Sequence, residues 1–220
     1  MVTKKSWELF SHFVNNCRGH PKKVACLWLD GDGNEEARWT YAELYERARV
    51  VAAHLKLTYG LQKGDRVLLA YEPCIEFFAA FWACVGTGVI AVPVCPPDPF
   101  NPDSDMTDKL VSIWQDSQPK LALTSATYKD SIAAAREYLG PAFNKVMRNK
   151  DHVLDVTQRL WLATTRLDFV PVTEWDFPTA EQVPLLESDT LFLQYTSGST
   201  GGAKGVEVKH RSLGVNCVNC

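Results

Sequence analysis

The residues best suited to chemistry form the run TSGSTGGAKG, from Thr196 to Gly205. The apolar stretch TLFLQY, residues 190–195, comes directly before this run and reads as a strand. Glycines let backbone N–H groups approach anionic oxygens closely, hydroxyl groups add short hydrogen bonds, and one lysine adds positive charge. A flexible linker has a similar composition, but that interpretation leaves the preceding strand and the embedded Lys204 unexplained. The run therefore predicts a loop that binds a polyphosphate.

Two other phosphate-binding loops do not fit the same letters. A Walker A loop reads GxxxxGK followed by Ser or Thr. Counted from Gly198, its second glycine position holds Ala203, and Gly205 follows Lys204. A GxGxxG dinucleotide loop also fails, because Thr200 stands at its second glycine position. The predicted loop is therefore neither a P-loop nor a Rossmann loop.

The longer run YTSGSTGGAKGVEVKH, from Tyr195 to His210, resembles the phosphate-loop motif of the acyl-adenylate-forming superfamily. This superfamily includes acyl-CoA synthetases, fatty-acyl-AMP ligases, peptide-synthetase adenylation domains and luciferases. WTYAEL, residues 39–44, and the stretch from GDRVLL to VCPP, residues 64–97, resemble its first two core motifs. The loop departs once, with Ala203 where proline is usual, and we expect a modest change in loop rigidity. AVPVCPPDP and LQYTSGST are most similar to fatty-acyl-AMP ligases and related loading domains.

The resemblance implies that ATP and Mg²⁺ are used with a carboxylic acid, whose carboxylate attacks the α-phosphate to give an acyl-AMP and pyrophosphate. It also implies which residues hold the β- and γ-phosphates: Thr196, Ser197, Gly198, Ser199, Thr200, Gly201, Lys204 and Gly205. Lys204 would supply the charge, and Ser199 and Thr200 hydroxyl donors. His210 matches a histidine that follows the loop in the family, and an equally good interpretation is a capping or packing residue at a helix start.

The resemblance further implies that the adenine-binding segment, the glutamate for Mg²⁺, the ribose-binding aspartate and the domain with the catalytic lysine lie downstream. We therefore expect residues 1–220 to be an incomplete amino-terminal portion of an AMP-binding (adenylation) domain, inactive alone, with no catalytic residue or metal ligand assigned. The expected parent activity is activation of a carboxylic acid, in the first place a fatty acid. CoA or an acyl carrier protein domain is the expected acceptor. The alternatives are a fragment of an acyl-CoA synthetase and a non-catalytic acyl- or nucleotide-binding domain of the same fold.

Alternating strands and helices must position this loop. Short, continuously apolar runs indicate strands at 24–29, 66–71 and 120–124, with a further short strand ending near Trp39. Thr40 and Glu43 form the pattern of a capping box at a helix start. Helical spacing of apolar residues continues from there and recurs at 106–115 and 130–139. The pattern predicts an α/β fold with a largely parallel sheet flanked by helices, as in the amino-terminal part of the large domain of the family.

Three longer segments need separate interpretation. Residues 77–94 carry no charge and are long enough to cross a membrane, but Gly86 and Gly88 interrupt them, so we expect a buried helix, a turn and a buried strand instead. Residues 93–105, rich in Pro and Asp, predict a surface loop. Residues 142–188 show no clear pattern. There we expect Trp161 and Trp175 to be packing anchors. We expect a solvated charged face to be formed by Lys145, Arg148 and Lys150.

Composition excludes several other classes. The formal charge of −3 over 220 residues argues against a nucleic-acid partner. Seven cysteines without framework spacing, and an amino terminus without a signal peptide, favour a reduced, cytoplasmic chain.

Two local patterns resemble metal sites but do not fit them. Asp30, Asp32 and Asn34 resemble the start of an EF-hand, but Glu35 and Tyr41 occupy the positions that require Gly and Glu, so a hairpin loop is expected. The CxxC of Cys217 and Cys220 lacks a partner pair, which argues against a metal or redox site.

Overall fold

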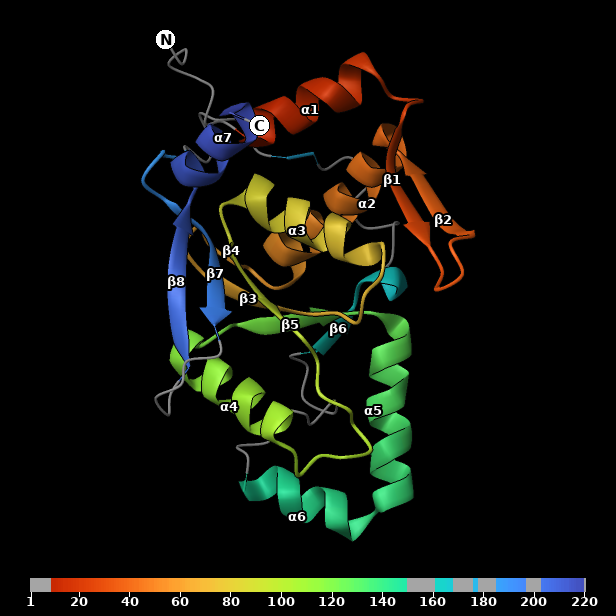
Figure 1. Ribbon diagram of the computed structural model, residues 1–220. Coiled ribbons are helices and arrows are strands. Elements are labelled where there is room, and N and C mark those ends of the chain that lie inside the picture. The colour runs from red at the N-terminus through yellow and green to blue at the C-terminus, as the bar shows by residue number, and fades with distance from the viewer. Residues whose placement is uncertain (1–8, 150–160, 168–175, 178–184, 197–202, 220) are drawn as a thin grey trace.

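The computed structural model describes residues 9–149, 161–167, 176–177, 185–196 and 203–219 (Figure 1). Seven α-helices, one π-helix (η1), one 3₁₀-helix (η2) and eight strands occur in these ranges. In chain order they are α1 (Leu9–Gly19), β1 (Val24–Leu29), β2 (Glu35–Thr40), α2 (Tyr41–Ala53), η1 (His54–Thr58), β3 (Arg66–Ala70), α3 (Glu76–Thr87), β4 (Ile90–Val94), α4 (Asp105–Ser117), β5 (Leu121–Thr124), α5 (Ala126–Leu139), α6 (Pro141–Asn149), β6 (Trp161–Ala163), η2 (Thr164–Arg166), β7 (Thr190–Thr196), β8 (Lys204–Lys209) and α7 (His210–Asn219).

Six strands form one sheet in the order β6-β5-β3-β4-β7-β8. The pairs β6–β5, β5–β3, β3–β4 and β4–β7 are parallel, and only β8 is antiparallel to its neighbour. The strands β1 and β2 form a separate antiparallel hairpin. This mostly parallel sheet with helices on both faces confirms the predicted fold class.

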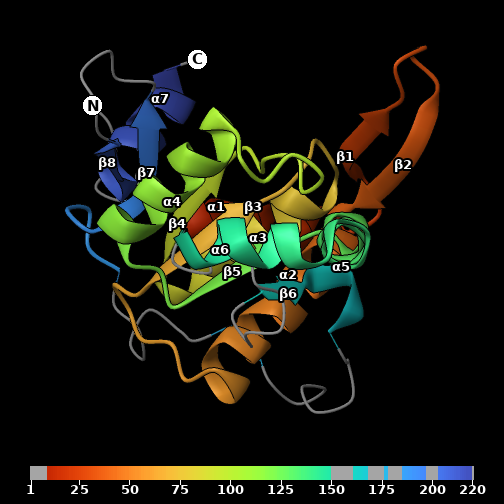
Figure 2. The same ribbon diagram turned by 90° about the horizontal axis from the view of Figure 1, so that it is seen from below.

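The central strand β3 shows why the sheet is covered on both faces. Val67 and Leu69 pack against α2 and α3 on one face, whereas Leu68 and Ala70 pack against α4, α5 and α6 on the other. All four side chains are fully buried, as alternation along a strand between two helical layers requires. Figure 1 shows α2 and α3 on the opposite side of the sheet from α4, α5 and α6, and Figure 2 views the molecule from below, the side on which α6 lies in Figure 1.

The capping box predicted at Thr40 is present. The Thr40 hydroxyl accepts a hydrogen bond from the Glu43 backbone N–H, and the Glu43 carboxylate accepts one from the Thr40 backbone N–H. The helix α2 therefore begins where the sequence predicts. Its apolar face packs into two clusters, through Leu44 near α1 and through Val51 near the sheet.

The uncharged segment 77–94 forms the predicted helix, turn and strand. The helix α3 ends at Gly88, whose φ of 71° lies in the left-handed region that glycine adopts without strain. The strand β4 follows and pairs with β3 along its whole length. None of the helices in the described ranges combines the length and the apolar character needed to cross a bilayer.

Two boundaries and one region differ from expectation. The helix α5 begins at Ala126, four residues before the predicted start, because the Ser125 hydroxyl accepts a hydrogen bond from the Tyr128 N–H and caps it. Gly140 ends this helix as predicted, yet α6 begins at once with Pro141. The region that showed no clear pattern contains α6, β6 and η2.

The residues expected as packing anchors and as a charged face lie partly in the described ranges. Trp161 is a packing anchor, 2% exposed between the rings of Trp114 and Tyr128. Lys145 and Arg148 are exposed, as expected of a solvated face. Trp175 and Lys150 lie outside the described residues.

Candidate functional site

The predicted phosphate loop joins two neighbouring antiparallel strands. Thr196, the last residue of β7, pairs with Lys204, the first residue of β8. Both residues are exposed, so a residue with a hydroxyl group and a residue with an ammonium group are cross-strand neighbours where the loop leaves the sheet. Five further predicted site residues lie outside the described residues: Ser197, Gly198, Ser199, Thr200 and Gly201. The structure therefore brings together the two ends of the predicted site.

The sheet places this loop at an edge suited to ligand binding. The strand β7 is parallel to β4, with Phe192 beside Ala91, so its carboxyl end lies on the same edge as those of β3, β4 and β5. The sheet order changes at β3, because β4 lies on one side of it and β5 on the other. The helix α3 crosses one face of the sheet and α4 the other. Open α/β sheets bind ligands in the crevice at such a point.

The helix α4 supports both limbs of the loop. The Tyr195 hydroxyl, one residue before the end of β7, donates a hydrogen bond to the Asp116 carboxylate. The Ala203 backbone N–H, one residue before β8, donates to the Ser112 hydroxyl oxygen at 3.3 Å. In Figure 1, β7 and β8 run across the direction of β5 and their lower ends approach α4. No sequence pattern pointed to Asp116 or Ser112, because helical spacing marks the apolar face of α4 and not its polar contacts.

Gly205 has a steric role that the motif did not reveal. It pairs with Tyr195 across the hairpin, and a Cβ placed on Gly205 would lie 2.9 Å from Tyr195 Cζ. That distance is shorter than ordinary contact, so a larger residue at position 205 would have to displace the far end of the Tyr195 ring. The packing of the hairpin is therefore sufficient to explain a glycine at this position, whether or not it also contacts a phosphate.

His210 is the first residue of α7 and is 3% exposed. Its backbone N–H donates a hydrogen bond to the Asp189 carbonyl oxygen at 3.1 Å, and the Asp189 carboxylate forms an ion pair with Lys63 at 2.6 Å. Burial lowers the pKa of His210, Asp189 opposes this shift, and Lys63 adds to it. These contacts match the interpretation of His210 as a packing residue at a helix start.

A cavity of about 190 Å³ lies beside the hairpin, between the end of β4, one side of α4 and the Tyr195 ring. Its size is enough for a small apolar group. Sequence patterns did not single it out, because its residues come from three separate elements. The lining residues are Pro93, Val94, Cys95, Met106, Lys109, Leu110, Ile113 and Tyr195.

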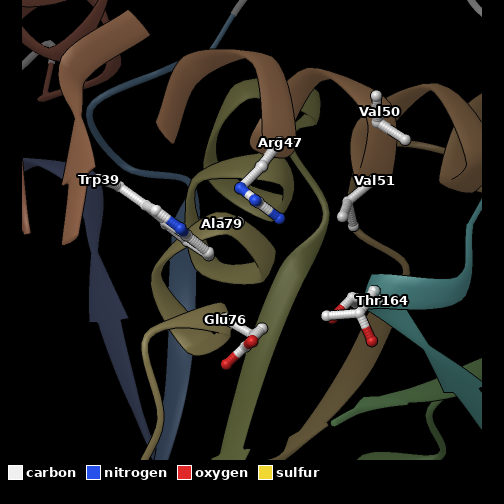
Figure 3. Close-up of a pocket in the computed structure, with 8 residues that line it drawn as sticks. Trp39, Arg47, Val50, Val51, Glu76, Ala79 and Thr164 are labelled. Carbon is white, nitrogen blue, oxygen red and sulfur yellow. The ribbon is translucent and has the colours of Figure 1, made fainter. Parts of the chain in front are cut away.

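A second cavity, shown in Figure 3, is too small to hold a substrate. Its volume is about 30 Å³, which is room for about one water molecule. Arg47 of α2 lies 4.5 Å from the centre of the Trp39 ring, and Glu76 comes from the start of α3. Thr164 lines it from the end of β6, which is four strands away from β7, or roughly 19 Å at ordinary strand spacing. This cavity is not part of the loop site.

Comparison with known proteins decides the family. A family model described as AMP-binding enzyme matches residues 13–220. The chain belongs to this family of AMP-binding enzymes. This match confirms the predicted superfamily, which rested on the loop motif and on the two motifs at residues 39–44 and 64–97.

Relatives within the AMP-binding family include ligases of fatty acids. A medium-chain-fatty-acid–(acyl-carrier-protein) ligase of Moorena producens is 31% identical over 89% of this chain and 29% of its own length. A propionate–CoA ligase of Salmonella typhimurium is 28% identical over 85% of this chain and 30% of its own length. The crystal structure of a fatty acyl-adenylate ligase from Legionella pneumophila, in complex with acyl adenylate and pyrophosphate, has a TM-score of 0.73 and 28% identity. The match covers 99% of this chain and 33% of the Legionella ligase chain. The chain thus spans about a third of the length of these relatives.

The described residues fit a nucleotide phosphate better than a metal ion. Thr196 and Lys204 offer a hydroxyl donor and a cation at the mouth of the loop, which is a suitable donor set for phosphate oxygens. No cluster of three His, Cys, Asp or Glu side chains that could hold a metal is found among the residues described. The Asp30 turn is a hairpin turn, in which Asp30 accepts the backbone N–H groups of Asp32 and Asn34. No described residue is therefore assigned to Mg²⁺.

Proposed function

We propose that this AMP-binding chain is the amino-terminal portion of an adenylation domain that activates a carboxylic acid, in the first place a fatty acid, with ATP. The observation that carries the proposal is the pairing of Thr196 with Lys204 at the mouth of the loop, on the carboxyl edge of the parallel sheet. The relatives named as ligases of fatty acids support the choice of acid.

The reaction joins two anions, so neutralisation of charge and positioning should dominate catalysis. The carboxylate oxygen would form a bond to the α-phosphorus of ATP, and the bond from that phosphorus to the β-phosphate bridging oxygen would break. The electron pair leaves with pyrophosphate, and an acyl-AMP remains. The Lys204 ammonium would offset charge on the β- and γ-phosphates, and the Thr196 hydroxyl would donate to one of their oxygens. The remaining donors of the proposed site are Ser197, Gly198, Ser199, Thr200, Gly201 and Gly205. No step is assigned to Mg²⁺.

The acyl acceptor is proposed to be CoA or an acyl carrier protein. Relatives with each kind of acceptor in their names support both candidates. A non-catalytic binding domain of the same fold is a weaker candidate, because binding alone has less need of an exposed lysine paired with an exposed hydroxyl group at the loop mouth.

The test is acid-dependent ATP–pyrophosphate exchange by the full-length protein, measured with a panel of fatty acids and amino acids. Exchange should occur with a fatty acid, and Lys204→Ala should reduce kcat/KM for ATP by at least about tenfold. Lys209→Ala is the matched control. It removes the same charge from the far end of β8, where the Lys209 ammonium donates to the Ser188 carbonyl oxygen at 3.1 Å. Unchanged exchange in Lys204→Ala would overturn the role of the loop, and exchange only with amino acids would overturn the choice of acid.

A further inference from the structure

We infer that Tyr195, Asp116 and Ser112 are positioning residues for the phosphate loop, which fix its two ends on α4 and so set the place of Thr196 and Lys204. The inference about catalysis rests on the proposed function. The inference about how the loop is held rests on the contacts alone.

Tyr195 contacts both strands of the hairpin and the helix. Its ring lies over Gly205 on β8, and its hydroxyl donates to Asp116. Burial raises the pKa of Tyr195 well above its ordinary value, and the Asp116 carboxylate raises it further. The hydroxyl group therefore stays protonated at any ordinary pH and remains a donor. Because the Asp116 bond fixes one end of the ring, the ring in turn restricts the separation of the two strands directly before the loop.

Ser112 supports the other limb. It lies four residues before Asp116 on α4, which places both side chains on one face of the helix. The Ser112 hydroxyl oxygen accepts the Ala203 backbone N–H, next in the chain to Lys204. One contact thus falls on each side of the Thr196–Lys204 pair.

The helix that carries these contacts is itself fixed on the centre of the sheet. The Arg66 guanidinium, at the start of β3, donates to the Ser117 carbonyl oxygen at 2.7 Å and to the Gln118 carbonyl oxygen at 3.0 Å. Leu110 and Ile113 bury the other side of α4 against the sheet. The two ends of the loop therefore contact a helix that is anchored to the sheet by hydrogen bonds and by apolar packing, and accurate placement of a catalytic group requires such support.

The matched test compares two tyrosines that make the same kind of bond. The Tyr45 hydroxyl donates to the Asp176 carboxylate at 2.6 Å, and Tyr45 is half-buried like Tyr195. Tyr195→Phe and Tyr45→Phe each remove one hydroxyl group and keep the ring. In the full-length protein we expect Tyr195→Phe to raise KM for ATP about tenfold, with a smaller change in kcat and in KM for the acid. Tyr45→Phe should leave KM for ATP within about twofold.

A second readout needs no activity. Hydrogen exchange of the Ala203 amide should become about tenfold faster or more in Ser112→Ala, because its acceptor is lost. Ser112→Thr, which keeps the hydroxyl group, should restore slow exchange. Equal effects of the two tyrosine variants on KM for ATP, or unchanged exchange of the Ala203 amide in Ser112→Ala, would overturn the inference. A wild-type protein without acid-dependent exchange would instead overturn the proposed function, and hydrogen exchange would still decide whether these residues hold the loop.

Discussion

The ring of Tyr195 lies directly over the backbone of Gly205, so close that a Cβ at Gly205 would approach Tyr195 Oη to 3.0 Å. The hydroxyl group of the same ring donates a hydrogen bond to the Asp116 carboxylate. Gly205 and Tyr195 therefore pack against each other directly, and a substitution at either residue should change the position of the other.

Gly205→Ala should act mainly by displacing this ring. The added methyl group forces Tyr195 away from Asp116, so we expect a loss of about 1–3 kcal/mol in the free energy of unfolding and a rise in KM for ATP. The effects of Gly205→Ala and Tyr195→Phe should not add, because both variants break the same hydrogen bond. Urea unfolding and pyrophosphate exchange measure the two effects.

Gly31→Ala is the control for this substitution, because no atom lies within 4 Å of a Cβ at Gly31. Equal losses of stability in Gly31→Ala and Gly205→Ala would show that the ring does not require a glycine.

Thr40→Ala should destabilise α2 at its start. The variant removes the hydroxyl oxygen that accepts the Glu43 N–H, and loss of such a cap costs about 1 kcal/mol. The urea midpoint should fall accordingly. Ser131→Ala is a suitable comparison, because Ser131 lies inside α5 and its hydroxyl donates only to the Thr127 carbonyl oxygen of the same helix. A midpoint that falls equally in both variants would argue against the capping role.

His210 should make stability depend on pH. Because burial lowers its folded-state pKa below the ordinary value of 6.5, the unfolded state takes up a proton first as the pH decreases. Stability should therefore be complete above about pH 6.5 and should decline below it, until the pH reaches the folded-state pKa. His210→Gln should reduce the difference between urea midpoints at about pH 7.5 and about pH 5.5. The same substitution at the exposed His20 should leave that difference unchanged, and an equal reduction there would contradict the prediction.

Local patterns predicted much of the fold, because they act over a few residues. The capping box at Thr40 and the interruption at Gly88 set element ends by local hydrogen bonding and backbone freedom, and both appear as predicted. The strand β6 was not predicted, since three residues are too few to show a period. The strand β8 was not assigned either, although Val206 and Val208 alternate with Glu207 and Lys209, because a run of six residues next to a glycine-rich loop gives a weak signal.

The phosphate chemistry of the candidate site stays a prediction from residue types, and the contacts that support the loop were not predicted. Residue types alone predict a phosphate loop from Thr196 to Gly205, and the structure adds that Thr196 pairs with Lys204 across the hairpin. Asp116 lies 79 residues from Tyr195 in the chain, so only the folded sheet and helix bring the two together. The expectation for His210 stays open between two roles, and its burial could not be predicted, because burial depends on contacts distant in sequence.

The position of β8 has a practical consequence for the experiments. It is the last strand of the sheet in the described part of the chain, and Val206 on it is 53% exposed. An open edge strand can pair with a second molecule, and charged side chains along it discourage this pairing. On β8 those charges are Lys204, Glu207 and Lys209. Neutralising Lys204 thus removes an aggregation barrier as well as a phosphate contact, and light scattering should accompany every assay of that variant.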